Sequence, residues 1–260
     1  MGVGYESYTS TGKLQFNSEM FTYALQSCGQ VVAENRQVGN TSPRSVMLPS
    51  AYVGKFVALG AGNGYSAGYA GSYSLSAGDT RRIYATNAPA GTVFTYYVFG
   101  ISTTIPPSNF GLEVKNSAGQ ITFSSNHRTM KVLNIVGDGL GSVTYGGKSL
   151  AYAQGQWSGH RIAGHKQYYG GGGTGGGGPT GPTLPEENEG GGYYSSYLND
   201  GKIYGGTVLD GGQTISGATL SWDDVQIGPG PDEPPPPDYY IPLKLFVIDV
   251  TGFPTSGTMF

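Results

Sequence analysis

The chain carries the segment Gly4-Tyr-Glu-Ser-Tyr-Thr-Ser-Thr-Gly-Lys-Leu-Gln-Phe-Asn-Ser18, and 107 residues later it carries Gly111-Leu-Glu-Val-Lys-Asn-Ser-Ala-Gly-Gln-Ile-Thr-Phe-Ser-Ser125. The two segments align without a gap, and when they are extended to Thr22 and Thr129, seven of 19 positions are identical. Unrelated segments of this composition would share about one or two positions, so a match at a fixed offset indicates a repeated structural unit. We therefore predict two related modules, which begin near residues 2 and 109.

Each copy of the repeat predicts a β-hairpin. Apolar residues alternate with polar ones around Val114 and again around Phe123, which is the pattern of a half-buried strand. Between these two runs the second copy has a turn that ends on Gly119, and the first copy has Gly12 at the matching position. A glycine there permits the positive φ angle that such turns require. Backbone geometry alone therefore explains both glycines.

The rest of the chain predicts further strands. Strand-like runs follow each hairpin at a spacing of roughly ten residues, with Gly, Asn and Pro between them, as in a sandwich or barrel. They are residues 23–33, 45–53, 56–59, 82–86 and 93–101 in the first module, and 130–136, 142–145, 150–153, 203–209, 214–220 and 241–251 in the second. We predict an all-β fold of two tandem β-sandwich-like modules, residues 1–107 and 108–260, divided at Pro106-Pro107.

The second module is longer than the first, and we assign the excess to a glycine-rich insertion at residues 170–192. Its composition is typical of a flexible linker. Tyrosine pairs on both sides of it favour a contact surface instead. A second biased stretch, residues 223–238, contains four consecutive prolines and five acidic residues, and it predicts an extended polyproline arm.

Charge and cysteine content exclude several classes of protein. The chain has 14 basic and 17 acidic residues, for a formal net charge of -3. It therefore lacks the excess of positive charge that is typical of proteins that bind nucleic acid or an anionic membrane. The single cysteine, Cys28, excludes an intramolecular disulfide framework. The N-terminus lacks a signal-peptide pattern, and no apolar stretch is long enough to span a membrane. We therefore expect a soluble product of cytoplasmic synthesis with no membrane insertion.

A search for catalytic and metal-binding patterns finds none that meets its geometric requirement. His160 and His165 are five residues apart in a glycine-containing segment, which suits no metal cage. The letters of a nucleophile elbow occur at Gly64–Gly68, but no helix signal follows them. Cys28 lies in a strand-like run, where a cysteine is usually a small core residue. We expect no enzyme, no metal and no cofactor.

The aromatic residues offer a binding surface. Tyr together with Ser, Gly and Asn is the composition of adaptable recognition loops, and residues 61–73 have this composition. The competing interpretation is that most of the 20 tyrosines are ordinary half-buried sheet residues. Our candidate receptor-contact residues are the aromatic side chains on either side of the insertion: Trp157, Tyr168, Tyr169, Tyr193 and Tyr194.

The start of the repeat resembles the opening of a family of small tailed-bacteriophage proteins that are encoded among tail-tip and tail-fibre genes. Proteins of this family begin with a Gly-hydrophobic-x-hydrophobic strand, a Ser/Asp-Gly turn and a Phe-x-Ser strand, as residues Gly111–Ser125 do here. The resemblance covers the first twenty or so residues of each module. The chain differs from the usual form of the family because it has two copies and a glycine-rich insertion.

This resemblance implies a non-enzymatic structural protein of a phage tail, made in the host cytoplasm and located in the virion beside other tail proteins. We expect the first module to dock on the tail and the second to present residues 168–194 to a host receptor, either a polysaccharide or an outer-membrane protein. By analogy with phage fibres we also expect the chain to form a homotrimer, although it has no coiled-coil heptad. Two alternatives stay open: a purely structural assembly or decoration protein, and a carbohydrate-binding or carbohydrate-processing protein.

Overall fold

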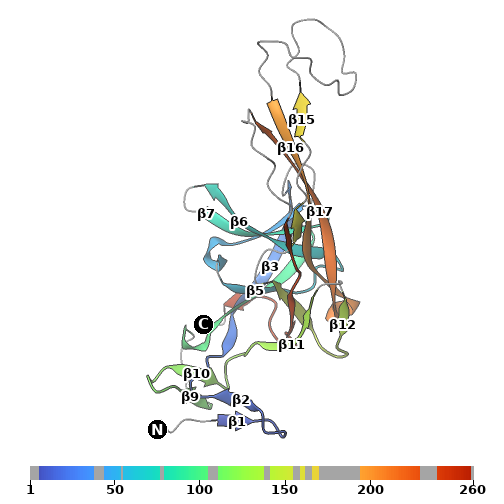
Figure 1. Ribbon diagram of the computed structural model, residues 1–260. Coiled ribbons are helices and arrows are strands. Elements are labelled where there is room, and N and C mark those ends of the chain that lie inside the picture. Colours follow the sequence, from blue (N-terminus) through green and yellow to red (C-terminus); the bar gives the residue numbers. More distant parts are fainter. Residues whose placement is uncertain are drawn as a thin grey trace, which may run out of the picture.

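The computed structural model consists almost entirely of β-strands (Figure 1), which confirms the all-β prediction. The structure describes residues 6–37, 44–53, 55–76, 79–104, 111–137, 141–154, 159–161, 166–169, 194–228 and 239–258. The strands of the first half are β1 (Glu6–Tyr8), β2 (Leu14–Asn17), β3 (Tyr23–Gln37), β4 (Arg44–Leu48), β5 (Phe56–Leu59), β6 (Ser66–Ser76), β7 (Asp79–Thr86) and β8 (Val93–Ile101). Short 3-10 helices follow β4 and β8, namely η1 (Ser50–Tyr52) and η2 (Ser102–Thr104).

The second half has strands in the same order, with β14, β15 and β18 inserted among them and β20 at the end. They are β9 (Glu113–Lys115), β10 (Ile121–Ser124), β11 (Lys131–Val136), β12 (Ser142–Thr144), β13 (Leu150–Gln154), β14 (Gly159–Arg161), β15 (Lys166–Tyr169), β16 (Tyr194–Leu209), β17 (Thr214–Gly228), β18 (Tyr239–Ile241), β19 (Leu245–Asp249) and β20 (Gly257–Thr258). The 3-10 helix η3 (Asp210–Gly212) connects β16 to β17.

Both predicted hairpins are present. β1 pairs with β2 and β9 pairs with β10, each as a separate two-stranded antiparallel sheet. The turn glycines adopt the expected left-handed conformation, with a φ angle of 77° at Gly12 and 76° at Gly119. In the second turn the Asn116 Oδ1 accepts a hydrogen bond from the backbone N–H of Gln120 at 2.8 Å, a side-chain contact that fixes turns of this kind.

The other strands form one large antiparallel sheet that folds into two layers. The first layer has the order β11-β19-β13-β5-β8-β3. Strand β3 belongs to both layers, because its residues up to Val32 pair with β8 and its residues from Ala33 onward pair with β4. The second layer has the order β4-β7-β6-β16-β17-β12. β12 then lies beside β11, so the sheet nearly closes into a barrel (Figure 1).

Six strands of the first half correspond one to one with six strands of the second. In the first half β8 pairs with β3 and β5, and β7 pairs with β4 and β6. In the second half β19 pairs with β11 and β13, and β17 pairs with β12 and β16. The halves meet where β5 pairs with its counterpart β13 and β6 with its counterpart β16. This is the pattern of an internal two-fold axis, so the repeat extends well beyond the hairpins.

Each half therefore contributes three strands to each layer, and the two predicted modules share one sandwich. The predicted boundary at residues 107 and 108 lies outside the described residues.

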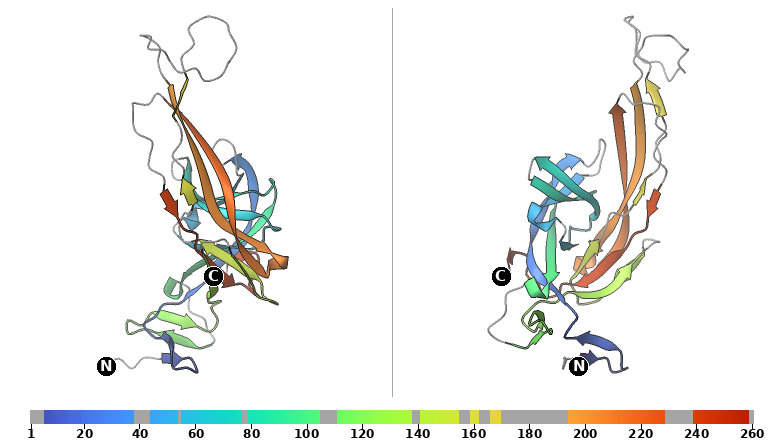
Figure 2. Two further views of the ribbon diagram at one scale, coloured as in Figure 1. Left: turned by 45° about the vertical axis from the view of Figure 1, so that its right-hand side comes forward. Right: turned by 60° about the vertical axis from the view of Figure 1, so that its left-hand side comes forward.

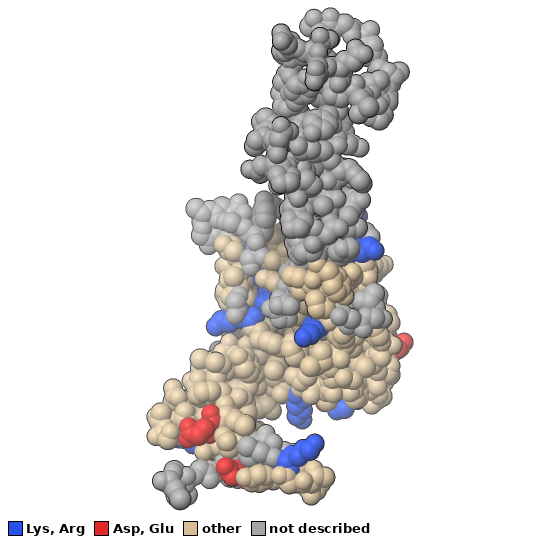
Figure 3. Space-filling model, in the orientation of Figure 1, with Lys and Arg blue, Asp and Glu red and all other residues tan. Residues whose placement is uncertain are grey.

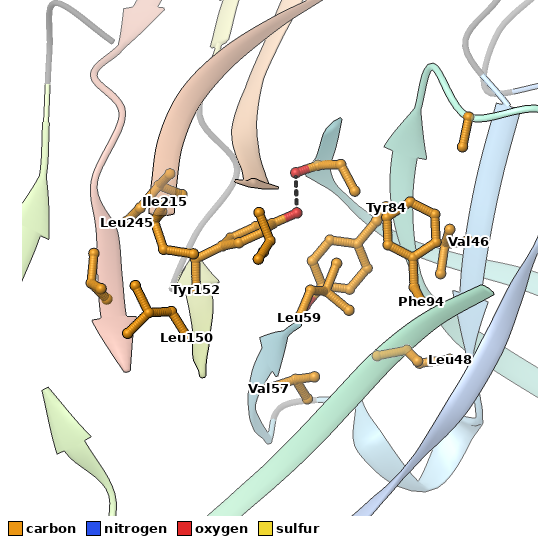
Figure 4. Close-up of a cluster of buried hydrophobic side chains, with 14 of the residues drawn as sticks. Val46, Leu48, Val57, Leu59, Tyr84, Phe94, Leu150, Tyr152, Ile215 and Leu245 are labelled. Carbon is orange, nitrogen blue, oxygen red and sulfur yellow. Dashed lines mark hydrogen bonds between the residues drawn. The ribbon is translucent and has the colours of Figure 1, made fainter. Parts of the chain in front are cut away.

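The main hydrophobic core lies between the two layers and takes side chains from both halves (Figure 4). Its large, fully buried members are Leu48, Leu59, Tyr84, Phe94, Leu150, Tyr152, Ile215, Leu243 and Leu245. Burial of a side chain of this size contributes about 1.5–3 kcal/mol. A second cluster covers the outer face of the first layer, where Phe253 packs with its ring 6.2 Å from that of Tyr97. Apolar burial on both faces explains why these strands have continuous hydrophobic sequences.

The two joints between the halves pack on each other through Tyr152. In the first layer Tyr152 lies opposite Leu59, and in the second layer Ala67 lies opposite Gly206. The Tyr152 hydroxyl donates a hydrogen bond to the carbonyl oxygen of Ala67 at 2.8 Å (Figure 4). A Cβ atom on Gly206 would lie only 2.8 Å from the Tyr152 ring. The glycine thus makes room for a side chain that contacts both joints.

Two predictions about loops are wrong. Residues 61–73 were expected to form a recognition loop, but Ser66–Ser76 is strand β6, which pairs with β7. Residues 223–228 were expected to begin a polyproline arm, but they are the end of β17 and pair in unbroken register with β16. The reason is the same in both cases: a neighbouring strand satisfies the backbone hydrogen bonds, and neither segment contains proline. The insertion at 170–192 and residues 229–238 lie outside the described residues.

Alkaline pH is expected to destabilise this fold through Tyr84. Burial raises the pKa of Tyr84 from 10.0 to about 12, although the nearby Arg82 guanidinium opposes the increase. Because the pKa is higher in the folded state, the stabilisation is complete below pH 10 and is lost as the pH rises through about 12. This difference corresponds to about 3 kcal/mol. Urea unfolding at increasing pH should show a smaller alkaline loss in Tyr84→Phe than in the parent chain, and equal losses would contradict the assignment.

Candidate functional site

The described members of the predicted contact set lie at the end of the molecule farthest from the hairpins. β15 pairs with the start of β16, so that Tyr169 lies opposite Tyr194 and Tyr168 lies opposite Ser195. β17 pairs with β16 on its other side. We call β15 together with residues 194–200 of β16 and 223–228 of β17 the distal ribbon, and Figures 1 and 2 show that it projects beyond the sandwich. Trp157 and Tyr193 lie outside the described residues.

The distal ribbon is built from the parts of the second half that have no counterpart in the first. β6 pairs with β16 only through Ser66 and Ala67, and a bulge next to Gly71, whose φ angle is 116°, changes the direction of β6. Beyond this point β14 and then β15 take the place of β6 beside β16, and β18 pairs with β14. Of the strands added to the repeat, β15 thus lies on the projecting part of β16, whereas β14 and β18 lie beside the sandwich near β6 and β7 (Figure 2).

The two repeat hairpins lie together at the opposite end (Figure 1), which we call the hairpin end. The Glu19 carboxylate accepts hydrogen bonds from the backbone N–H of Ser117 at 3.1 Å and from its hydroxyl at 3.4 Å. The carbonyl oxygen of Thr122 accepts bonds from the backbone N–H and the hydroxyl of Thr22 at 3.1 and 2.6 Å. These bonds join the first copy of the repeat to the second.

The hairpin end has an amphipathic surface. Large apolar side chains are exposed there, namely Tyr8, Met20, Phe21 and Leu112. Acidic and basic side chains also lie at this end on the face that Figure 3 shows. Exposed apolar residues that are grouped and bordered by polar ones are typical of a protein interaction surface.

The motifs that resembled catalytic patterns have structural explanations. Ser66, the serine of the Gly64–Gly68 letters, begins β6, and its hydroxyl shares a 2.6 Å hydrogen bond with the hydroxyl of Thr207. Cys28 is buried in β3, and burial raises the pKa of its thiol. His160 lies in β14, whereas His165 is outside the described residues. Within the described ranges no group of three or more His, Cys, Asp or Glu residues is placed to hold a metal ion.

Sequence reasoning missed one buried charged residue, Arg82, which is only 6% exposed. Its Nε donates to the Tyr84 hydroxyl at 2.9 Å, its Nη1 to the Lys55 carbonyl at 2.7 Å, and its Nη2 to the Gln154 carbonyl at 3.2 Å. The guanidinium carbon lies 4.5 Å from the centre of the Tyr69 ring. A usable signal was present, because Arg82 is two residues from the core residue Tyr84 and thus on the inward face of β7.

Comparison with known proteins gives no relative: no family model, no curated protein and no solved structure matches the chain. In the described part of the chain, no helix has the length and apolar character needed to cross a membrane. The features that point to a function are therefore the distal ribbon, the hairpin end and the buried Arg82 with its hydrogen-bond partners.

Proposed function

We propose that the chain is a structural component of a bacteriophage tail, which attaches to the tail at the hairpin end and contacts the host surface through the distal ribbon. The observation that carries this proposal is the position of the strands added to the repeat. A duplicated sandwich needs no β14, β15 or β18 to complete its two layers. Of these, β15 instead pairs with the part of β16 that projects from the end of the molecule opposite the hairpins (Figure 1).

The composition of the distal ribbon suits a receptor contact. Tyr168, Tyr169 and Tyr194 lie on adjacent strands at its far end, and the glycine-rich insertion connects these strands. Tyrosine supplies a large contact area at a small cost in conformational entropy. A paired ribbon holds such residues in a fixed register, which reduces the entropy lost on binding.

The hairpin end supports the other half of the proposal. The resemblance to phage tail proteins rests on the hairpin sequences. The structure brings both copies to one end (Figure 1), where large apolar side chains are exposed. A surface of this kind is suited to a protein partner, such as a neighbouring tail subunit. The chain would then connect the tail at one end with the host surface at the other.

A competition experiment tests the role of the distal ribbon. Purified protein is expected to block adsorption of the source phage to its host cells. A triple variant with Tyr168, Tyr169 and Tyr194 replaced by serine should need at least about tenfold more protein for the same block, because it loses the aromatic contact area. The control replaces Tyr65, an exposed tyrosine outside both the ribbon and the hairpin end, by serine and should block as well as the parent protein.

Three outcomes separate the alternatives. If the triple variant blocks adsorption as well as the control does, the ribbon is not the receptor contact. If the parent protein binds tail proteins but not cells, the purely structural role is favoured. Release of reducing sugar from host polysaccharide by the parent protein would favour a carbohydrate-processing enzyme.

A further inference from the structure

A pocket of about 380 Å³ lies at the end of the first layer where β5 begins and β13 ends. It forms because β5 and β13 pair through only two residue pairs, Leu59 with Tyr152 and Ala58 with Ala153. Beyond these pairs the strands separate, and Arg82 reaches across from the second layer to the carbonyl oxygens of Lys55 and Gln154. The volume is within the range of small-molecule sites, which is roughly 300–1,000 Å³.

The lining of the pocket combines positive charge with apolar walls. Its charged residues are Arg82 and Lys55, and no Asp or Glu is among the residues that line it. The apolar part of the wall consists of Tyr23, Phe56, Val57, Phe99 and Ile101. Aromatic rings lie close together there, since the Phe56 ring is 6.0 Å from that of Tyr23 and 6.3 Å from that of Phe99.

Arg82 retains donors for a ligand. A guanidinium group has five N–H donors, and the bonds to Tyr84, Lys55 and Gln154 use three of them. One N–H on each terminal nitrogen remains without a partner among the described residues. No carboxylate of the described chain forms an ion pair with Arg82. A buried cation of this kind is favoured when an anion completes its coordination.

The second half of the chain provides an internal comparison. Arg82 lies opposite Leu48 in the β4–β7 pair, whereas the corresponding strand pair of the second half, β12 with β17, is formed through Thr214, Ile215 and Ser216 of β17, none of which is charged. The same strand pair is therefore built in the second half without a charged residue. The arginine is a specific feature of the first half.

We propose that this pocket binds a small organic carboxylate with an apolar ring, such as benzoate. The carboxylate accepts the two remaining N–H donors of Arg82, a planar pairing that suits both groups, and Lys55 adds a second positive charge. The ring packs between the aromatic side chains of the wall. The proposal is separate from the proposed function, because none of the lining residues belongs to the distal ribbon or to the hairpins.

Titration calorimetry with benzoate and benzamide tests the pocket directly. Benzamide has the same shape but no charge. The parent protein is expected to bind benzoate with a Kd below about 1 mM and benzamide at least about tenfold more weakly, because hydrogen bonds to a charged acceptor are roughly twice as strong as neutral ones. Equal affinities for the two compounds, or no saturable benzoate binding up to about 10 mM, would overturn the proposal.

Two variants and a control assign the binding to named residues. Arg82→Gln, which removes the charge and keeps a polar side chain, should lose at least about tenfold in benzoate affinity and keep its benzamide affinity. Because Arg82 is buried, its replacement can also disturb folding, so a second variant changes an exposed residue. Lys55→Gln should lose about threefold in benzoate affinity. Lys244→Gln changes another exposed lysine and should bind as the parent does. An equal loss in Lys244→Gln and Lys55→Gln would mean a general charge effect and would contradict the assignment.

Discussion

A Gly205→Val variant is expected to lose at least about 3 kcal/mol of unfolding free energy, as overpacked sites do when backbone must move. Gly205 lies where β16 of the second half pairs with β6 of the first. A Cβ atom at this position would lie 2.2 Å from the carbonyl oxygen of Ala67 and 2.5 Å from the Cα of Gly68. Both neighbours are backbone atoms, so no side-chain rotation relieves the clash, and the two halves would have to separate in the second layer.

Urea unfolding followed by circular dichroism measures this effect. Gly146→Val is the matched control, because a Cβ atom there meets nothing within 4 Å and its backbone does not need glycine. The control should stay within about 0.5 kcal/mol of the parent chain. An unfolding midpoint of Gly205→Val equal to that of the control would show that β6 and β16 do not pair as described.

A Tyr152→Ala variant is expected to lose about 4 kcal/mol, which is in the range for removal of a large buried aromatic side chain. Tyr152 is fully buried, and its ring and hydroxyl contact both joints between the halves, at Gly206 and at Ala67. Natural domains have only about 5–15 kcal/mol of stability. The loss should therefore be visible as a large decrease in the unfolding midpoint.

Two further variants separate the ring from the hydroxyl. Tyr152→Phe keeps the ring and removes only the hydrogen bond to the Ala67 carbonyl, which is expected to cost about 1 kcal/mol. Tyr65→Ala removes an exposed tyrosine and should cost less than about 1 kcal/mol. If Tyr152→Ala is no less stable than Tyr152→Phe, the ring does not hold the joints together.

Local patterns in the sequence predicted the strands whose own residues show clear turn glycines or runs of large apolar side chains. The hairpin turns followed from glycines at matched positions, and the bounds of β5 and β8 agree with the predicted runs 56–59 and 93–101. β6 was missed because Ser, Gly and Tyr alternate there without the large aliphatic residues that mark a strand. It is stabilised as a strand by its pairing with β7, a tertiary contact that composition does not reveal.

The pairing between the halves was beyond the reach of the sequence pattern. The repeat indicated two related modules, but it does not say whether each module closes on itself or exchanges strands with the other. That choice depends on close backbone approach at Gly68 and Gly205 and on the volume left for Tyr152 at Gly206. Such constraints join residues that are far apart in the sequence, so no local window contains them.

The candidate sites differ in the same way. The tyrosines beside the insertion stand out in the sequence, and the register that places Tyr169 opposite Tyr194 follows from the structure. The Arg82 pocket depends on where β5 and β13 separate, and this point is visible only once the two strands are paired. The sequence alone indicates that Arg82 is a charged residue at an inward-facing position. It does not reveal the pocket that Arg82 lines.

The measurement that tests the central claim most directly is immunogold electron microscopy on intact phage particles from the source lysate, with an antibody against this chain. The proposed function predicts gold label at the distal tip or the fibres of the tail. Particles that carry no label anywhere, in a lysate that contains the antigen, would contradict the assignment to the phage tail.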